Sequence, residues 1–178
     1  MSVLQTSRLL LRPWCDSDLA PFAQLNADPR VMEFLPAVLS TQESDLLVSR
    51  IEKHFLNHGF GLYAAELQQD RSFIGYVGLA VPSFHAKFMP CVEIGWRLSH
   101  AYWGHGLATE GARAVVRHAF ETLHLDALVS FTVPANIRSR RVMEKLGMTN
   151  DPSDDFDHPN FPEGHPLCRH VLYRLARP

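Results

Sequence analysis

The sequence predicts a mixed α/β fold in which helices pack on a sheet that is partly antiparallel and partly parallel. Short apolar runs alternate along the chain with longer segments in which apolar residues recur every three or four positions. Three of the runs follow one another through short connections, which is typical of antiparallel strands. A later succession of strand, helix and strand across residues 92–133 is typical of a parallel crossover.

Length and composition limit the class of protein. The 178 residues, 1–178, fit a single domain with a core of its own. Hydrophobic residues make up 46% and charged residues 20%, which excludes wholesale disorder. A net charge of −2 argues against a nucleic-acid partner. The chain start lacks a secretory signal and no apolar run approaches about 18 residues, so we expect a cytoplasmic protein without a membrane partner.

The three cysteines are odd in number and lie far apart. They form neither a disulfide framework nor a metal-binding pair, and we expect them to be buried reduced thiols: Cys15, Cys91 and Cys168.

The amino-terminal part begins with a strand and two helices. The first helix has Asp16 or Ser17 as its cap, and the second ends at Gly59. Three strands follow, the second of which alternates apolar residues with glycine. The predicted ranges are a strand at 8–12, helices at 16–27 and 41–57, and strands at 60–67, 73–81 and 92–98.

The carboxy-terminal part contains the clearest helix, because one apolar stripe runs through residues 107–123. A buried strand, a helix ending at Gly147, an acidic proline-containing loop and a closing strand follow. Their predicted ranges are 128–133, 136–146, 150–166 and 169–175.

The segment between the strand at 92–98 and the helix at 107–123 points to chemistry. Gly104 and Gly106 let the backbone turn sharply and approach a ligand closely. The free N–H groups at the following helix start, helped by the helix dipole, favour an anion. The pattern therefore predicts a site for a diphosphate.

Other readings of these glycines stay open at this point. Gly104 and Gly106 match the first two glycines of the dinucleotide fingerprint, and Asp126 follows 20 residues after Gly106. Thr109 occupies the third glycine position, however, and the segment follows an antiparallel portion, which disfavours a dinucleotide-binding oxidoreductase. No Gly-Lys-Ser/Thr follows, so a kinase-type P-loop is excluded. A purely structural turn is the remaining alternative.

Four segments in order carry a resemblance to a known family. They read TSRLLLR at 6–12, EIGW at 93–96, YWGHGLATE at 102–110 and NIRSRRVMEKLGM at 136–148. Together they resemble the GNAT acetyltransferase superfamily, and most of all its branch of Rim-type ribosomal-protein-alanine N-acetyltransferases.

The resemblance implies a fold and an activity. The fold is a mostly antiparallel sheet with a parallel splayed pair, flanked by helices. The activity is transfer of an acetyl group from acetyl-CoA, without a metal, to a primary amine on a small molecule or a protein N-terminus. A non-catalytic CoA-binding module is the alternative.

The resemblance also implies which residues bind acetyl-CoA. Backbone amides at 104–109 would hold the pyrophosphate, and the backbone at 96–98 would pair with pantetheine like an added strand. Trp103 replaces the usual Gln or Arg. The implied binding residues are Trp96, Arg97, Leu98, Trp103, Gly104, His105, Gly106, Leu107, Ala108, Thr109, Asn136 and Ser139.

Two residues are implied to be catalytic. Glu93 matches the carboxylate that serves many members as general base, and a solvated position on the sheet face is the alternative. The tyrosine that often acts as general acid is replaced by Met143, so Ser139 is expected to assist the leaving thiolate. Asn136 can contact CoA and cap the helix at once. The nearby cations Arg138, Arg140 and Arg141 reach CoA phosphates or form a solvated face.

Other polar groups suggest weaker hypotheses. His54 and His58 have metal-ligand spacing but no evident third ligand. The acidic loop at 150–166 could attract a cationic amine, or could simply be solvated. The segment 82–90, with Phe and Met, would line a substrate channel or a contact in a homodimer. The oligomeric state is left open.

Overall fold

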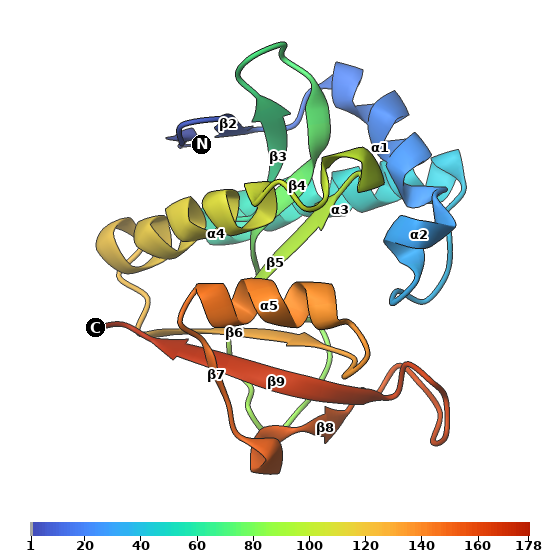
Figure 1. Ribbon diagram of the computed structural model, residues 1–178, viewed down its shortest axis with the longest axis vertical. Helices are drawn as coiled ribbons and strands as arrows, with labels where there is room; N and C mark the ends of the chain where they lie inside the picture. The colour runs from blue at the N-terminus through green and yellow to red at the C-terminus, as the bar shows by residue number, and fades with distance from the viewer. Residues whose placement is uncertain (1) are drawn as a thin grey trace.

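The computed structural model describes residues 2–178, and one nine-stranded sheet runs through it (Figure 1). The strand order is β1-β2-β3-β4-β5-β6-β9-β7, and β8 pairs with β9 beside this path. The strands are β1 (Leu4–Gln5), β2 (Leu9–Arg12), β3 (Leu62–Leu67), β4 (Phe73–Ala80), β5 (Glu93–Leu98), β6 (Ala127–Thr132), β7 (Thr149–Asn150), β8 (Phe156–Asp157) and β9 (Arg169–Ala176).

Helices cover both faces of this sheet. In Figure 1, α4 and α5 lie on the viewer's side and α3 crosses behind the strands. A capping box of Ser40 and Glu43 begins α3, and Gly59, with a φ of 75°, ends it. The helices are α1 (Leu19–Asn26), α2 (Pro29–Met32), α3 (Thr41–His58), α4 (Leu107–Arg117) and α5 (Ile137–Lys145).

The sheet is antiparallel except between β5 and β6. These two strands are parallel and share a single register pair, Glu93 with Val129, supported by the bond from the Val129 N–H to the Val92 carbonyl (2.9 Å). Beyond that pair the strands diverge, which leaves a gap beside β5. The expected mostly antiparallel sheet with a splayed parallel pair is confirmed, and the doubly wound parallel sheet of a dinucleotide-binding fold is excluded.

The buried apolar side chains form one cluster that joins the helices to the sheet. An ion network lies at its edge. The Arg12 guanidinium contacts the carboxylates of Asp18 and Glu66, each at 2.7 Å, and both carboxylates are almost fully buried. This network ties the segment before α1 to β2 and β3.

Several elements differ from the sequence prediction, among them the short strands β1 and β7, which it did not include. The helix predicted at 107–123 is α-helical only to Arg117 and continues as a π-helical turn over His118–Thr122, because an apolar stripe does not distinguish the two helix types. The four-residue α2 is too short for a periodic signal, although Asp28 caps it and Pro29 begins it. The predicted loop at 150–166 contains β8 and the 3-10 turn Pro152–Asp154.

The cysteines only partly follow the prediction. Cys168 is buried, Cys91 is half-buried and Cys15 is exposed, so the expectation of buried thiols is wrong for Cys15. Cys15 lies in the turn before α1, where its backbone N–H (3.0 Å) and its thiol (3.4 Å) both donate to the Asp18 carboxylate. Across residues 2–178, no helix combines the length and the apolar character that a membrane crossing requires.

Candidate active site

The loop before α4 has the backbone form that its glycines predict. Gly104 and Gly106 have φ values of 80° and 78°, a region that favours glycine. The first helical hydrogen bond of α4 runs from the Glu110 N–H to the Gly106 carbonyl (3.0 Å). The N–H groups of residues 107–109 therefore have no acceptor within the helix, and they form an anion-binding end beside β5.

Two side chains hold this loop in place. The Trp103 indole N–H donates to the Leu98 carbonyl (2.8 Å), which fastens the loop to the end of β5. The Arg8 guanidinium donates to the His105 carbonyl (3.0 Å) from the other side of the loop. The loop is thus fixed at both ends before any ligand binds.

A cavity of about 430 Å³ opens at the gap beside β5, between α2, α4 and α5. It brings together every predicted site residue except His105, whose carbonyl is bonded to Arg8. The predicted residues that line it are Glu93, Trp96, Arg97, Leu98, Trp103, Gly104, Gly106, Leu107, Ala108, Thr109, Asn136 and Ser139.

Among residues 2–178, Glu93 is the only acidic side chain that lines this cavity. Burial of its carboxyl group raises the pKa of Glu93 to about 8, and among residues 2–178 no hydrogen bond or ion pair offsets this shift. A carboxyl group with such a pKa exchanges protons near neutral pH, which suits a general base.

The start of α5 forms the opposite wall. The Asn136 side-chain oxygen accepts from the Ser139 N–H (3.2 Å), and its amide donates to the Thr132 hydroxyl (3.0 Å), so Asn136 is an N-cap that also ties α5 to β6. Ser139 lines the cavity one turn into the helix. Met143, at the position of the absent tyrosine, is 1% exposed and carries no proton to donate.

The three arginines of α5 have different surroundings. Arg138 lies 4.5 Å over the Trp103 ring and pairs with Glu33 (2.7 Å), so it bridges α5 to the segment after α2 across the cavity rim. Arg141 lines the cavity. Arg140 does not line it, and its guanidinium donates to the Tyr173 hydroxyl (3.2 Å) and to the Pro134 carbonyl.

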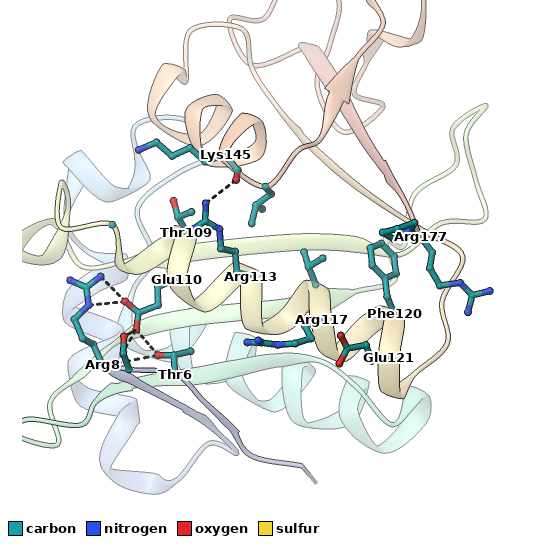
Figure 2. Close-up of a pocket in the computed structure, with 15 residues that line it drawn as sticks. Thr6, Arg8, Thr109, Glu110, Arg113, Arg117, Phe120, Glu121, Lys145 and Arg177 are labelled. Carbon is teal, nitrogen blue, oxygen red and sulfur yellow. Dashed lines mark hydrogen bonds and ion pairs between the residues drawn. The ribbon is translucent and has the colours of Figure 1, made fainter.

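A wider groove of about 1170 Å³ lies along the other side of α4 (Figure 2). Glu110 at one end accepts hydrogen bonds from Thr6 and Arg8, while Arg113 reaches the Lys145 carbonyl (3.2 Å). Burial raises the pKa of Glu110, but these hydrogen bonds outweigh that effect and lower it to about 2. Glu93 is not part of this groove, which meets the cavity only at the start of α4 and at Lys145.

The histidine pair of α3 has a structural role. His54 bonds the Phe60 carbonyl (2.9 Å) with one ring nitrogen and accepts from the Val81 N–H (2.9 Å) with the other. No nitrogen is left for a metal on His54, although its ring stacks 4.4 Å from that of His58. No group of three or more His, Cys, Asp or Glu within residues 2–178 has the arrangement of a metal site.

The acidic loop lies away from the cavity, and none of its carboxylates lines it. Asp154 pairs with Arg174 (2.6 Å), and Asp157 pairs with Arg169 (3.3 Å). The Asp155 carboxylate accepts from Asn150 (2.9 Å). The hypothesis that these groups attract the amine is therefore wrong, because they fasten the loop to β7 and β9.

The loop between β4 and β5 is less exposed than its sequence suggested. Phe84 and Phe88 pack with Phe156 and with Phe131 of β6, at ring distances of 4.8–6.1 Å. Of these rings only Phe131 lines the cavity. The aromatic cluster therefore supports the far end of β6, and the predicted substrate channel does not form there.

Comparison with known proteins identifies the family. Residues 8–149 match the family described as Acetyltransferase (GNAT) domain. The chain belongs to the GNAT acetyltransferase family. Among GNAT relatives, the FsC-acetyl coenzyme A-N(2)-transacetylase of Aspergillus fumigatus is 32% identical over 159 residues, covering 83% of this chain and 65% of that enzyme.

Solved GNAT structures agree with this fold. An acetyltransferase from Agrobacterium tumefaciens superposes with a TM-score of 0.78 at 29% identity, over 98% of this chain and 94% of that one. The ribosomal L7/L12 α-N-protein acetyltransferase RimL, solved with coenzyme A, superposes with a TM-score of 0.79 at 16% identity over 98% of each chain. The expected membership of the GNAT superfamily is confirmed, whereas at this identity the likeness to RimL concerns the fold alone.

Sequence reasoning missed the wall that faces α4. Val31, Phe34 and Leu35, in and after α2, line the cavity together with Tyr76 of β4. The signal for this turn was Asp28-Pro29, an N-cap followed by proline at the first helical position. Four residues are too few to show which side of such a helix faces the site.

Proposed function

We propose that this GNAT protein transfers the acetyl group of acetyl-CoA to a primary amine in the cavity beside β5. The observation that supports this most is the meeting, in one cavity, of the open N–H groups of α4 with the carboxyl group of Glu93. The family gives the reaction class, and the Aspergillus relative is named for acetyl-CoA and for transfer to nitrogen.

The start of α4 fits the diphosphate of CoA. Positive φ values at Gly104 and Gly106 turn the backbone so that N–H groups end at the cavity, and added Cβ atoms there would meet nothing closer than 3.8 Å. Arg141 and Lys145 of α5 add positive charge from the opposite wall. Pantetheine would lie in the gap between β5 and β6 and pair with the β5 backbone.

The chain then supplies a base for the amine and a hydrogen-bond donor for the leaving thiolate. The amine nitrogen attacks the thioester carbonyl carbon, a C–N bond forms, the C–S bond breaks, and the amine proton passes to Glu93. Ser139 donates a hydrogen bond to the departing CoA thiolate. Ser139→Ala should lower kcat about tenfold, since a thiolate needs little help to leave, and an unchanged kcat would remove this role.

Release of the CoA thiol in the presence of a panel of amines tests the proposal. Glu93→Gln should lower kcat by about 10²- to 10⁴-fold, the range typical of general-base catalysis, while acetyl-CoA affinity stays near that of the wild type. A wild-type protein that binds acetyl-CoA but acetylates no amine would support the non-catalytic alternative. Full activity in Glu93→Gln would remove Glu93 as the base.

A further inference from the structure

The acceptor side of the cavity is one face of β5. Glu93, Gly95 and Arg97 occupy every second position on this face, whereas Ile94, Trp96 and Leu98 lie on the other, where Ile94 and Leu98 are buried and Trp96 is half-buried. A Cβ atom built on Gly95 would have a single neighbour within 4 Å, the Glu93 Oε1 atom at 4.0 Å. The floor between Glu93 and Arg97 is therefore open, and the Glu93 carboxyl group leans over it.

Arg97 is held at the far end of this floor by buried polar groups. Its Nη1 donates to the Asn26 side-chain oxygen (2.7 Å), and the Asn26 amide donates to the Ser44 hydroxyl (2.9 Å). Asn26 and Ser44 are both 0% exposed, and they come from α1 and α3. The guanidinium also lies 5.3 Å over the ring of Tyr76, its register partner on β4.

This arrangement leaves most of the guanidinium donors of Arg97 unused. An arginine carries five N–H donors, and no carboxylate of residues 2–178 lies within ion-pair distance of Arg97. Arg30, on the same cavity wall, differs because Asp28 pairs with it at 2.7 Å. Arg97 is thus a fixed cation that lines the acceptor side without an anionic partner.

We propose that the acceptor is an amine that also carries a carboxylate several bonds from the reacting nitrogen. The carboxylate binds Arg97 and the amine meets Glu93, so this inference rests on the proposed function. The Cα atoms of Glu93 and Arg97 are separated by about 13 Å, since a strand rises about 3.3 Å per residue. The amine and the carboxylate of the acceptor therefore cannot be attached to the same carbon. A guanidinium fork suits a carboxylate, and Arg97 would repel the second cation of a polyamine.

Two pairs of acceptors, matched in length, test this inference. The small pair is 6-aminohexanoate and hexylamine; the peptide pair is Ala-Glu and Ala-Gln, each with an amidated carboxyl end. The wild type should prefer the carboxylate member of one pair by about 10- to 100-fold in kcat/KM, mainly through KM, as expected for a hydrogen-bonded charge. Which pair shows the preference distinguishes a small amino acid from a peptide N-terminus.

Variants of Arg97 test whether this residue causes the preference for a carboxylate. Arg97→Gln should bring the ratio within a pair close to one, and Arg97→Lys, which keeps the charge but not the fork, should retain part of it. Arg50→Gln removes an exposed charge from α3 and serves as the matched control. Thermal unfolding of each variant detects a folding defect. Such a defect would lower kcat/KM for both acceptors of a pair by the same factor and leave their ratio unchanged.

The outcomes separate this inference from the proposed function. Acetyl-CoA binding with no preference in either pair, or a preference that survives Arg97→Gln, would overturn the carboxylate assignment and leave acetyl transfer intact. Failure to bind acetyl-CoA would overturn the proposed function itself.

Discussion

Glu93 stands at the start of β5 with a half-buried carboxyl group that has no hydrogen-bond or ion-pair partner among residues 2–178. Its pKa of about 8 lies well above the ordinary value of 4.5, so the folded protein binds a proton that the unfolded chain has already released between these pH values. The contribution of Glu93 to stability is therefore fully present below about pH 4.5 and is lost as the pH rises to about 8.

This pKa predicts a stability difference that depends on pH. Glu93→Gln has a neutral side chain at every pH, so its melting temperature relative to the wild type should rise from about pH 5 to about pH 8 and then level off. Scanning calorimetry of both proteins at several pH values measures this difference in melting temperature. A difference that stays constant across this range would show that Glu93 titrates at its ordinary pKa.

At the scale of elements, the start of α4 depends on one backbone conformation. Gly106→Ala should destabilise the protein by about 1–2 kcal/mol, because its φ of 78° is strained for a residue with a Cβ atom. It should also weaken acetyl-CoA binding about tenfold, as relaxation of the turn moves the N–H groups away from the anion.

Gly59 provides a matched control for this prediction. It has a φ of 75° at the end of α3, and a Cβ atom there would meet nothing within 4 Å. Gly59→Ala should therefore cost similar stability and leave acetyl-CoA affinity unchanged. If the two alanine variants bind acetyl-CoA equally well, the loop before α4 is not the diphosphate site.

The elements also show what the sequence could predict. The glycine turn, the helix after it and Glu93 on the strand before it are close in the chain, so their pattern predicted their proximity. The hydrogen bonds that join Arg97 to the buried Asn26 and Ser44 depend on how α1 and α3 pack near β5, and no local pattern carries that information. For the same reason the paired carboxylates of the 150–166 loop were mistaken for free ones.

At the scale of the whole molecule, the buried ion network of Arg12 joins parts that are distant in sequence. Arg12→Met should destabilise the protein by about 3–5 kcal/mol, because Asp18 would remain buried without a cation and Glu66 would keep only its pair with the exposed Arg71. Arg169→Met, which removes an exposed pair with Asp157, should change stability by no more than about 1 kcal/mol. Urea unfolding of both variants measures their free energies of unfolding. Similar losses of stability would show that the ion network does not stabilise the attachment of the segment before α1 to β2 and β3.

The most direct test of acetyl transfer in the cavity beside β5 is calorimetric titration of the wild-type protein with acetyl-CoA and, separately, with NADH. We expect one acetyl-CoA to bind per chain in the micromolar range, and no binding of NADH. NADH binding in place of acetyl-CoA would contradict the assignment of the α4 start to CoA, and would mean that its two glycines hold a dinucleotide.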